Sequence, residues 1–440
     1  MQSEIESYLD TLCGEIRCKY ARRLVREEIK IHIEDNKKEG ESRGMDRIEA
    51  EKKAAQAMGD PEEVGRMMDK LHRPKTDILM LISISVLLFF GLAVFTVRHT
   101  SYIGIKGVLE MISGRPTIML FRVIGIAAFI LCLFVDLRSL LKKNIFIIIA
   151  GLIGIAGLLF INLTSKQHRF WEMPNEWISF ISYICICLFV ISFAGLLSRF
   201  RKKSWFTVIA AAGIALSAAC IMLFRENGQR ILAMCMLASF AVMFWFTNIK
   251  LPWKIIISVA IVAFMVNYSI KNSEYKNVLA YLGGFDKYDE ELTALLNEGL
   301  ANIQIIGAVP GAAEIFFANH VVFILLNFGI LPLALLITSL AVLVWRLIRV
   351  CIRIRDTQGR VLATGLAAFI TISVTASLLL TPLLIRSSGS YMPFLGSGPE
   401  FVLFSVFLGL IAGLYRRKDL YTAKDTAPLD KTRPHMIETA

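Results

Sequence analysis

The chain has 440 residues, 55% of them hydrophobic, and a mean hydropathy of +0.60. A soluble globular protein of this length is less apolar, so the composition excludes that class and predicts a membrane protein. The net charge of +12 does not indicate a nucleic-acid partner, because much of it lies in short loops between apolar segments.

Residues 1–76 are charged, and their apolar side chains recur at helical spacing, which predicts three helices and then a fourth. Gly59-Asp60-Pro61 marks the last junction: Gly59 ends a helix, Asp60 caps the next, and Pro61 takes its first position. This N-terminus lacks the early apolar core of a signal peptide. The residues that define the helices are Ile5, Leu9 and Leu12, then Ala21, Leu24, Ile29 and Ile33, then Ile48, Ala50, Ala54 and Met58, and finally Met67, Met68 and Leu71.

The same region carries a second, more specific pattern. Its parts are Tyr8-Leu9 with Leu12, Glu27-Glu28-Ile29 with His32-Ile33, Ala50-Glu51, Met58-Gly59-Asp60-Pro61 with Val64-Gly65, and His72-Arg73-Pro74-Lys75. Together these residues resemble the permease prefix (HAAS-like) domain, which stands ahead of bacterial membrane proteins and sensors. The resemblance implies that 1–76 is a small cytoplasmic helical module that binds a protein partner and has no catalytic role.

Ten later segments are apolar over most or all of the roughly 20 residues that a helix needs to cross a bilayer. Their spans are 77–97, 117–136, 145–163, 177–197, 205–224, 231–249, 253–270, 316–345, 361–385 and 400–415. The segment 316–345 is long enough to tilt or to begin outside the membrane. We therefore expect an all-α, polytopic membrane domain over 77–418, a large outer loop at 271–315 and a disordered cytoplasmic tail over 419–440.

Basic residues gather in the loops after the second, fourth, eighth and tenth segments, which all lie on one side of the membrane if ten segments exist. The positive-inside rule makes that side cytoplasmic. We therefore expect a multi-pass protein of the bacterial plasma membrane with both termini in the cytoplasm. None of the eight cysteines lies in a predicted outer loop or forms a C-x-x-C pair, so we expect neither a disulfide framework nor a cysteine metal site.

A loop rich in Gly, Ser and Pro, 387–400, separates the last two apolar segments. Small residues of this kind allow the backbone to approach a ligand closely. Arg386 directly precedes the loop. Arg122 lies within the second apolar segment, where a charge is costly and usually faces a cavity or a partner. The interpretations that stay open for Arg122 are a functional residue or member of an internal ion pair on one hand, and a side chain that extends to the headgroups on the other.

Several short motifs follow one another along the membrane domain. They are Arg169-Phe170-Trp171, Met173-Pro174-Asn175-Glu176, Asp356-Thr357-Gln358-Gly359-Arg360 with Ala363 and Gly365, Ser388-Gly389, and Met392-Pro393-Phe394-Leu395 followed by Gly396-Ser397-Gly398-Pro399-Glu400. These motifs resemble the SEDS family (shape, elongation, division and sporulation; FtsW, RodA and SpoVE type). The Ser-Tyr-Gly-Gly-Ser half of the last motif is altered in this chain.

The resemblance implies a protein of bacterial division, elongation or sporulation that polymerises peptidoglycan glycan strands from lipid II, the undecaprenyl-diphosphate-linked disaccharide. It also implies a class B penicillin-binding protein as partner. Two alternatives stay open: a catalytically silent scaffold that binds lipid II, and a transporter or flippase of the lipid-linked precursor. The sequence identifies no definite cofactor, although a divalent cation could stabilise the diphosphate leaving group.

Glycosyl transfer needs a carboxylate that takes the proton of the acceptor hydroxyl. The family's catalytic Asp falls on Ala318 in this chain, so the candidate carboxylates are Glu314 and Asp286. Both have a simpler interpretation, as a solvated carboxylate at a helix start for Glu314 and as part of a charged amphipathic face for Asp286. The candidate substrate-binding residues are Arg169, Glu176, His320, Arg386, Ser388, Gly389, Pro393, Phe394 and Ser397. We expect no protein-bound metal site.

Overall fold

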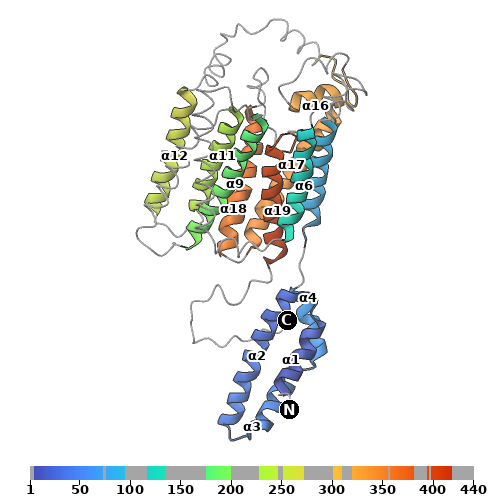
Figure 1. The fold of residues 1–440 in the computed structure, drawn as a ribbon, viewed down its shortest axis with the longest axis vertical. Helices are drawn as coiled ribbons and strands as arrows, with labels where there is room; N and C mark the ends of the chain where they lie inside the picture. Colours follow the sequence, from blue (N-terminus) through green and yellow to red (C-terminus); the bar gives the residue numbers. More distant parts are fainter. Residues whose placement is uncertain are drawn as a thin grey trace. The chain divides into compact units, whose positions relative to one another are not determined.

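The computed structural model describes residues 4–72, 76–94, 116–134, 175–199, 227–245, 251–271, 301–309, 320–354, 357–380, 394–395 and 398–418. These residues form helices and short connections, and no strand occurs among them. The chain divides into two compact units, residues 1–76 with 415–440, and residues 77–414 (Figure 1). Each unit is described by itself below.

The N-terminal unit is built from four helices: α1 (Glu4–Glu15), α2 (Lys19–Ser42), α3 (Arg47–Ala57) and α4 (Pro61–His72). α1 packs against the other three, and α2 packs along α3. The core contains most of the apolar positions that the helical spacing predicts in α1 and α2, among them Leu9, Leu12 and Ile33, which are fully buried. Val25 takes the core place predicted for Leu24, which is only partly buried. Burial of this apolar surface is the main force that holds the four short helices together.

The helix ends of this unit follow the sequence signals. Gly59 has φ +86°, a left-handed conformation that favours glycine, and ends the helix before it. Asp60 then accepts a hydrogen bond from the backbone N–H of Glu63 at 3.4 Å, as an N-cap residue does. Three of the predicted apolar positions are exposed: Ile48 at 76%, Met67 at 55% and Leu71 at 60%. In α3 the buried face is that of Ala50, Ala54 and Ala55, which leaves Ile48 towards solvent.

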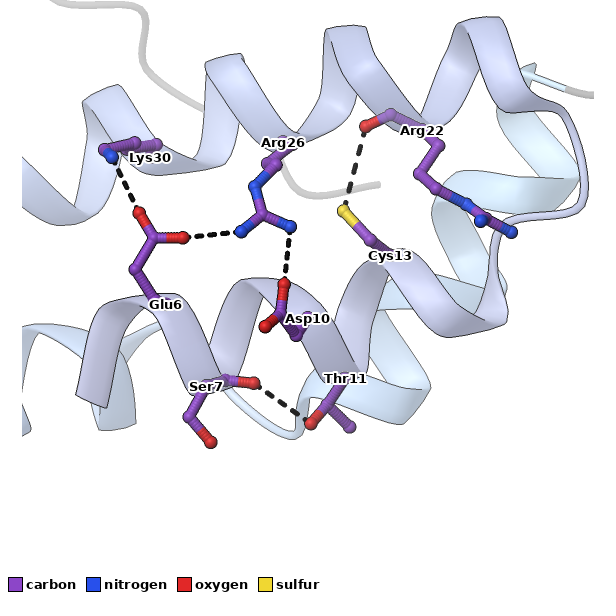
Figure 2. Close-up of polar contacts among 8 residues, drawn as sticks. All are labelled: Glu6, Ser7, Asp10, Thr11, Cys13, Arg22, Arg26 and Lys30. Atoms are coloured by element: carbon purple, nitrogen blue, oxygen red, sulfur yellow. Dashed lines mark hydrogen bonds and ion pairs between the residues drawn. The ribbon is translucent and has the colours of Figure 1, made fainter. Parts of the chain in front are cut away.

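Charged side chains connect α1 and α2 on the surface of the core (Figure 2). The guanidinium of Arg26 donates to Asp10 at 2.6 Å and to Glu6 at 2.5 Å, and Lys30 donates to the second oxygen of Glu6 at 2.8 Å. These bonds to Lys30 and Arg26 hold the pKa of the Glu6 carboxyl below its ordinary value. Beneath them the buried thiol of Cys13 contacts the carbonyl of Arg22.

The membrane unit begins with an apolar helix, Ile78–Val94. The helices that follow among the described residues are α6 (Pro116–Phe134), α9 (Asn175–Arg199), α11 (Asn227–Trp245), α12 (Leu251–Lys271), α16 (His320–Phe328), α17 (Ile330–Arg353), α18 (Thr357–Leu380) and α19 (Glu400–Arg416). α17 and the stretch Gly359–Leu378 of α18 are long and apolar enough to cross a membrane, and the Ile78–Val94 helix, α6, α9, α11 and α12 contain shorter apolar stretches. The predicted segments 145–163 and 205–224 lie outside the described residues.

α9, α11 and α18 pack side by side, with α12 against α11 and α17 against α18 (Figure 1). Glycines let α19 approach α6 closely. A Cβ on Gly409 would lie 2.6 Å from the Phe129 carbonyl, and one on Gly413 would lie 2.8 Å from the Cys132 carbonyl. Neither contact leaves room for a larger residue, so the two helices are in backbone contact.

The predicted segment 316–345 corresponds to more than one helix, because α16 ends at Phe328 and α17 begins at Ile330. Gly329 between them has φ +98°, and a Cβ there would meet the carbonyls of Gln304 and Ile305. The backbone of 304–309 pairs with this break: Gly307 donates to Phe328 at 3.0 Å, and Leu331 donates to Ile305 at 3.0 Å. The break therefore anchors the end of the predicted large loop.

Candidate ligand site around Arg122

Arg122 lies in the second turn of α6 and is 7% exposed. Its Nη2 donates a hydrogen bond to the carbonyl oxygen of Gly91 at 2.9 Å. The centre of its guanidinium lies 5.5 Å from the centroid of the Phe401 ring, a cation–π distance. A positive charge is therefore held among apolar helices, in contact with a backbone carbonyl and an aromatic ring.

Gly91 makes this arrangement possible because it has no side chain. A Cβ at this position would lie 2.5 Å from the carbonyl oxygen of Phe394 and 3.3 Å from Nη1 of Arg122. The first contact is with backbone, which cannot move aside as a flexible side chain can. The Ile78–Val94 helix, Arg122 and the backbone of Phe394 therefore meet at one point.

Phe394 belongs to the Pro-Phe core of the Gly/Ser/Pro loop. It is 2% exposed, and its ring packs against Phe404 of α19 at 5.4 Å between centroids. Its φ is +75°, a left-handed conformation that costs a residue with a Cβ about 1–2 kcal/mol. Backbone strain of this kind persists where the surrounding structure enforces it, and such places cluster at functional sites.

Glu400 supplies the opposite charge. It begins α19 and accepts a hydrogen bond from the backbone N–H of Gly398 at 3.1 Å. The next residue, Phe401, carries the ring that Arg122 faces, and the negative charge of Glu400 acts on the Arg122 guanidinium. Glu400 therefore places a negative charge near the Arg122 guanidinium, beside the Phe394 backbone.

These groups share one end of the helical unit, since Gly91 is near the end of its helix whereas Arg122 and Glu400 are near the starts of theirs. A guanidinium offers several planar N–H donors that match phosphate oxygens, and burial strengthens their interaction with an anion. The arrangement can therefore bind a phosphate or diphosphate group.

The structure places three of the residues predicted from sequence. Phe394 contacts the Arg122 cluster, His320 is the first residue of α16, and Glu176 is the second residue of α9. The predicted residues that lie outside the described part of the chain are Glu314, Asp286, Arg169, Arg386, Ser388, Gly389, Pro393 and Ser397. Within the described residues, no group of three or more His, Cys, Asp or Glu side chains is placed to hold a metal ion.

Gly91 and Glu400 are the site residues that sequence reasoning did not select. Gly91 is a single glycine in an apolar run, which by itself indicates only a possible close contact. Glu400 is the one acidic residue of the 387–400 loop and directly precedes an apolar segment. This position is the sequence feature that could have identified it.

Comparison with solved structures identifies the class of fold. Thermus thermophilus rod shape-determining protein RodA matches with a TM-score of 0.53 and 13% sequence identity, over 78% of this chain and 97% of that chain. A mutant of the same protein matches with a TM-score of 0.52 and 12% identity, over 78% of this chain and 98% of that chain. A structure described as the structural coordination of polymerization and crosslinking by a peptidoglycan synthase complex matches with 0.55 at 15% identity over 79% and 99%.

The protein thus has an all-helical, polytopic membrane fold like that of RodA, which confirms the predicted fold class and a multi-pass membrane location. At 12–15% identity the likeness defines the fold and not the activity. No family model and no curated protein matches the sequence. About a fifth of this chain is outside the match, whereas the neighbours are covered almost entirely.

Proposed function

We propose that this protein is a SEDS-type cell-wall protein that binds lipid II through the Arg122 site at the outer face of the plasma membrane. The RodA-like fold and the sequence motifs support the class. The basic loops support a topology with both termini in the cytoplasm, and this topology puts the Arg122 end of the unit outside. The prefix-like N-terminal unit then lies in the cytoplasm, where it binds a protein partner.

The single observation that carries the proposal is the buried Arg122 beside the strained backbone of Phe394. The diphosphate of lipid II is an anion that sits at the membrane surface, next to its lipid tail. Binding at Arg122 pairs the guanidinium with one negative charge of the diphosphate.

In the reaction we propose, the hydroxyl of an acceptor sugar attacks the anomeric carbon of the donor disaccharide. The new C–O bond forms as the bond between that carbon and the diphosphate oxygen breaks, and the lipid diphosphate leaves with the electron pair. A carboxylate takes the hydroxyl proton, and Glu314 and Asp286 are our candidates for it. Arg122, alone or with a divalent cation, stabilises the departing diphosphate.

A second function, that of a catalytically silent lipid II-binding scaffold, is favoured by one specific observation. Ala318 occupies the position where the family resemblance expects the catalytic Asp. A protein that keeps the cation site and lacks the base would bind the precursor without polymerising it. A precursor flippase is the third candidate, and translocation of lipid II in liposomes tests it.

The experiment supplies lipid II to the purified protein with its class B penicillin-binding partner and sizes the glycan products. We expect polymer from the wild-type protein, and less from Glu314→Ala or Asp286→Ala if that residue is the base. Retained lipid II without polymer would select the scaffold. Unchanged polymerisation in both variants would remove both candidate bases.

A further inference from the structure

A buried ion pair lies at the end of the membrane unit opposite the Arg122 site. Oδ1 of Asp77 is 3.3 Å from Nε of Arg346 in α17, and the two side chains are 4% and 19% exposed. The same carboxylate accepts a hydrogen bond from the backbone N–H of Met80 at 3.0 Å, which caps the Ile78–Val94 helix. The pair therefore fixes the start of this helix to α17.

Each of the two joined helices makes a different close backbone contact at its far end. Gly91 lies 14 residues after Asp77, about 21 Å along a helix, and contacts Arg122 and the Phe394 backbone. α17 begins next to Gly329, where the 304–309 segment is hydrogen-bonded. Arg122 and Phe394 lie on other elements than the Ile78–Val94 helix, so a shift of this helix along its axis would move Gly91 relative to both.

The contacts at Gly91 leave little tolerance for such a shift. The Arg122 hydrogen bond is 2.9 Å long, and the Phe394 carbonyl approaches closely enough to exclude a methyl group. Packed helices move as rigid elements, so a displacement at one end is carried to the other.

We propose that Asp77 and Arg346 are positioning residues for the Arg122 site, acting through the register of the Ile78–Val94 helix against α17. The purpose of the site rests on the proposed function, but the positioning itself does not. Asp77 is also the first residue of the membrane unit, directly after Thr76 of the N-terminal unit. The ion pair therefore stands where the chain enters the membrane unit.

Hydrogen exchange measured on the full-length protein in detergent tests this proposal without any activity assay. Asp77→Asn keeps a good N-cap residue while it removes the charge. Arg346→Gln removes the partner, and Arg349→Gln is the matched control. Arg349 lies three residues after Arg346 on α17 and is exposed. The centre of its guanidinium lies 4.0 Å from the centroid of the Trp345 ring.

We expect Asp77→Asn and Arg346→Gln each to accelerate exchange about tenfold in the amides of 87–94 and 401–408, because each leaves a buried charge without its partner. The double variant should be no faster than the faster single variant, since both remove one interaction. Arg349→Gln should match the wild type, and Arg346→Lys, which retains the charge, should restore protection at 401–408.

Acceleration confined to 78–82 and 343–350 would overturn the proposal, because the pair would then hold only its own helix ends. An equal effect of Arg349→Gln would overturn it as well. If a charge-removing variant unfolds throughout, the conservative variants decide. Asp77→Glu lengthens the carboxylate arm and should lower protection at 401–408 while α18 stays folded. Unchanged protection there in Asp77→Glu, with an intact Ile78–Val94 helix, would contradict the proposal. A failure of lipid II binding leaves all these outcomes readable.

Discussion

Two cysteines five residues apart differ in environment, and this difference has a chemical consequence. Cys13 is 4% exposed in the core of the N-terminal unit, and burial raises the pKa of its thiol. Cys18 is only partly buried. Because the thiolate is the reactive form, a raised pKa and a buried sulfur both slow alkylation.

We expect iodoacetamide at pH 8 to modify Cys18 at least about tenfold faster than Cys13 in the folded full-length protein. Peptide mass spectrometry over time measures the two rates, and the same reaction in urea supplies the control, since unfolding should make the rates similar. Equal rates in the folded protein would contradict the described core.

Glu6 connects two cations on α2, and its lowered pKa predicts a pH dependence. A carboxyl whose pKa is lower in the folded state adds stability above its unfolded pKa of about 4.5. That contribution is lost as pH falls through the folded value. Glu6→Gln should therefore lower the urea midpoint of the N-terminal unit at pH 7, and the difference from the wild type should shrink towards pH 3. A difference that is independent of pH would show that the bonds to Arg26 and Lys30 do not form in solution.

At the scale of the elements, the glycine contacts separate site geometry from packing. Gly91→Ala inserts a methyl group against the Phe394 carbonyl, whereas Gly409→Ala inserts one against the Phe129 carbonyl between α6 and α19. Both changes overpack the unit, and each should destabilise it by about 1–3 kcal/mol. Only Gly91→Ala also displaces a group that touches Arg122.

We therefore expect both variants to lower the thermal midpoint in detergent, and Gly91→Ala alone to weaken lipid II binding beyond what its stability loss explains. Scanning fluorimetry and a lipid II binding assay measure the two effects on the same preparations. Equal lipid II affinities of the two variants would show that Gly91 does not contribute to the binding site.

The sequence predicted most helices because a continuous apolar run needs no tertiary information. It predicted the Gly59 turn and the Asp60 cap for the same reason, since caps are local. It did not predict the break at Gly329, where the positive φ is stabilised by backbone bonds from 304–309, a segment over 20 residues earlier. Ile48 shows the same limit: helical spacing marks a face, but packing against α2 decides which face is buried.

For the candidate site, sequence patterns predict individual residues but not the contacts between them. Arg122 and Phe394 were predicted individually, one from a charge in an apolar segment and the other from a motif. Their meeting through Gly91 depends on the packing of helices whose residues are 31 positions apart or more. Spacing along the chain carries no information on such a contact.

At the scale of the whole molecule, the N-terminal unit has a hydrophobic core of its own. We expect residues 1–76 expressed alone to fold into a helical unit with a cooperative urea transition. Leu9→Ala should destabilise it by about 2–5 kcal/mol, because Leu9 is fully buried and its removal leaves a cavity. Ile48→Ala is the matched control on an exposed apolar residue and should change the midpoint little. A fragment without a cooperative transition in circular dichroism would contradict an independent core.

The central claim is that the RodA-like membrane unit binds a lipid-linked diphosphate at Arg122. Equilibrium binding of lipid II to the full-length protein in nanodiscs tests it most directly, with Arg122→Gln compared against wild type and against Arg349→Gln. A charge-assisted contact of about 1.5–3 kcal/mol predicts that Arg122→Gln binds roughly 10–100-fold more weakly. We expect Arg349→Gln to bind like the wild type. Lipid II affinity of a folded Arg122→Gln variant within about twofold of the wild type would contradict the account.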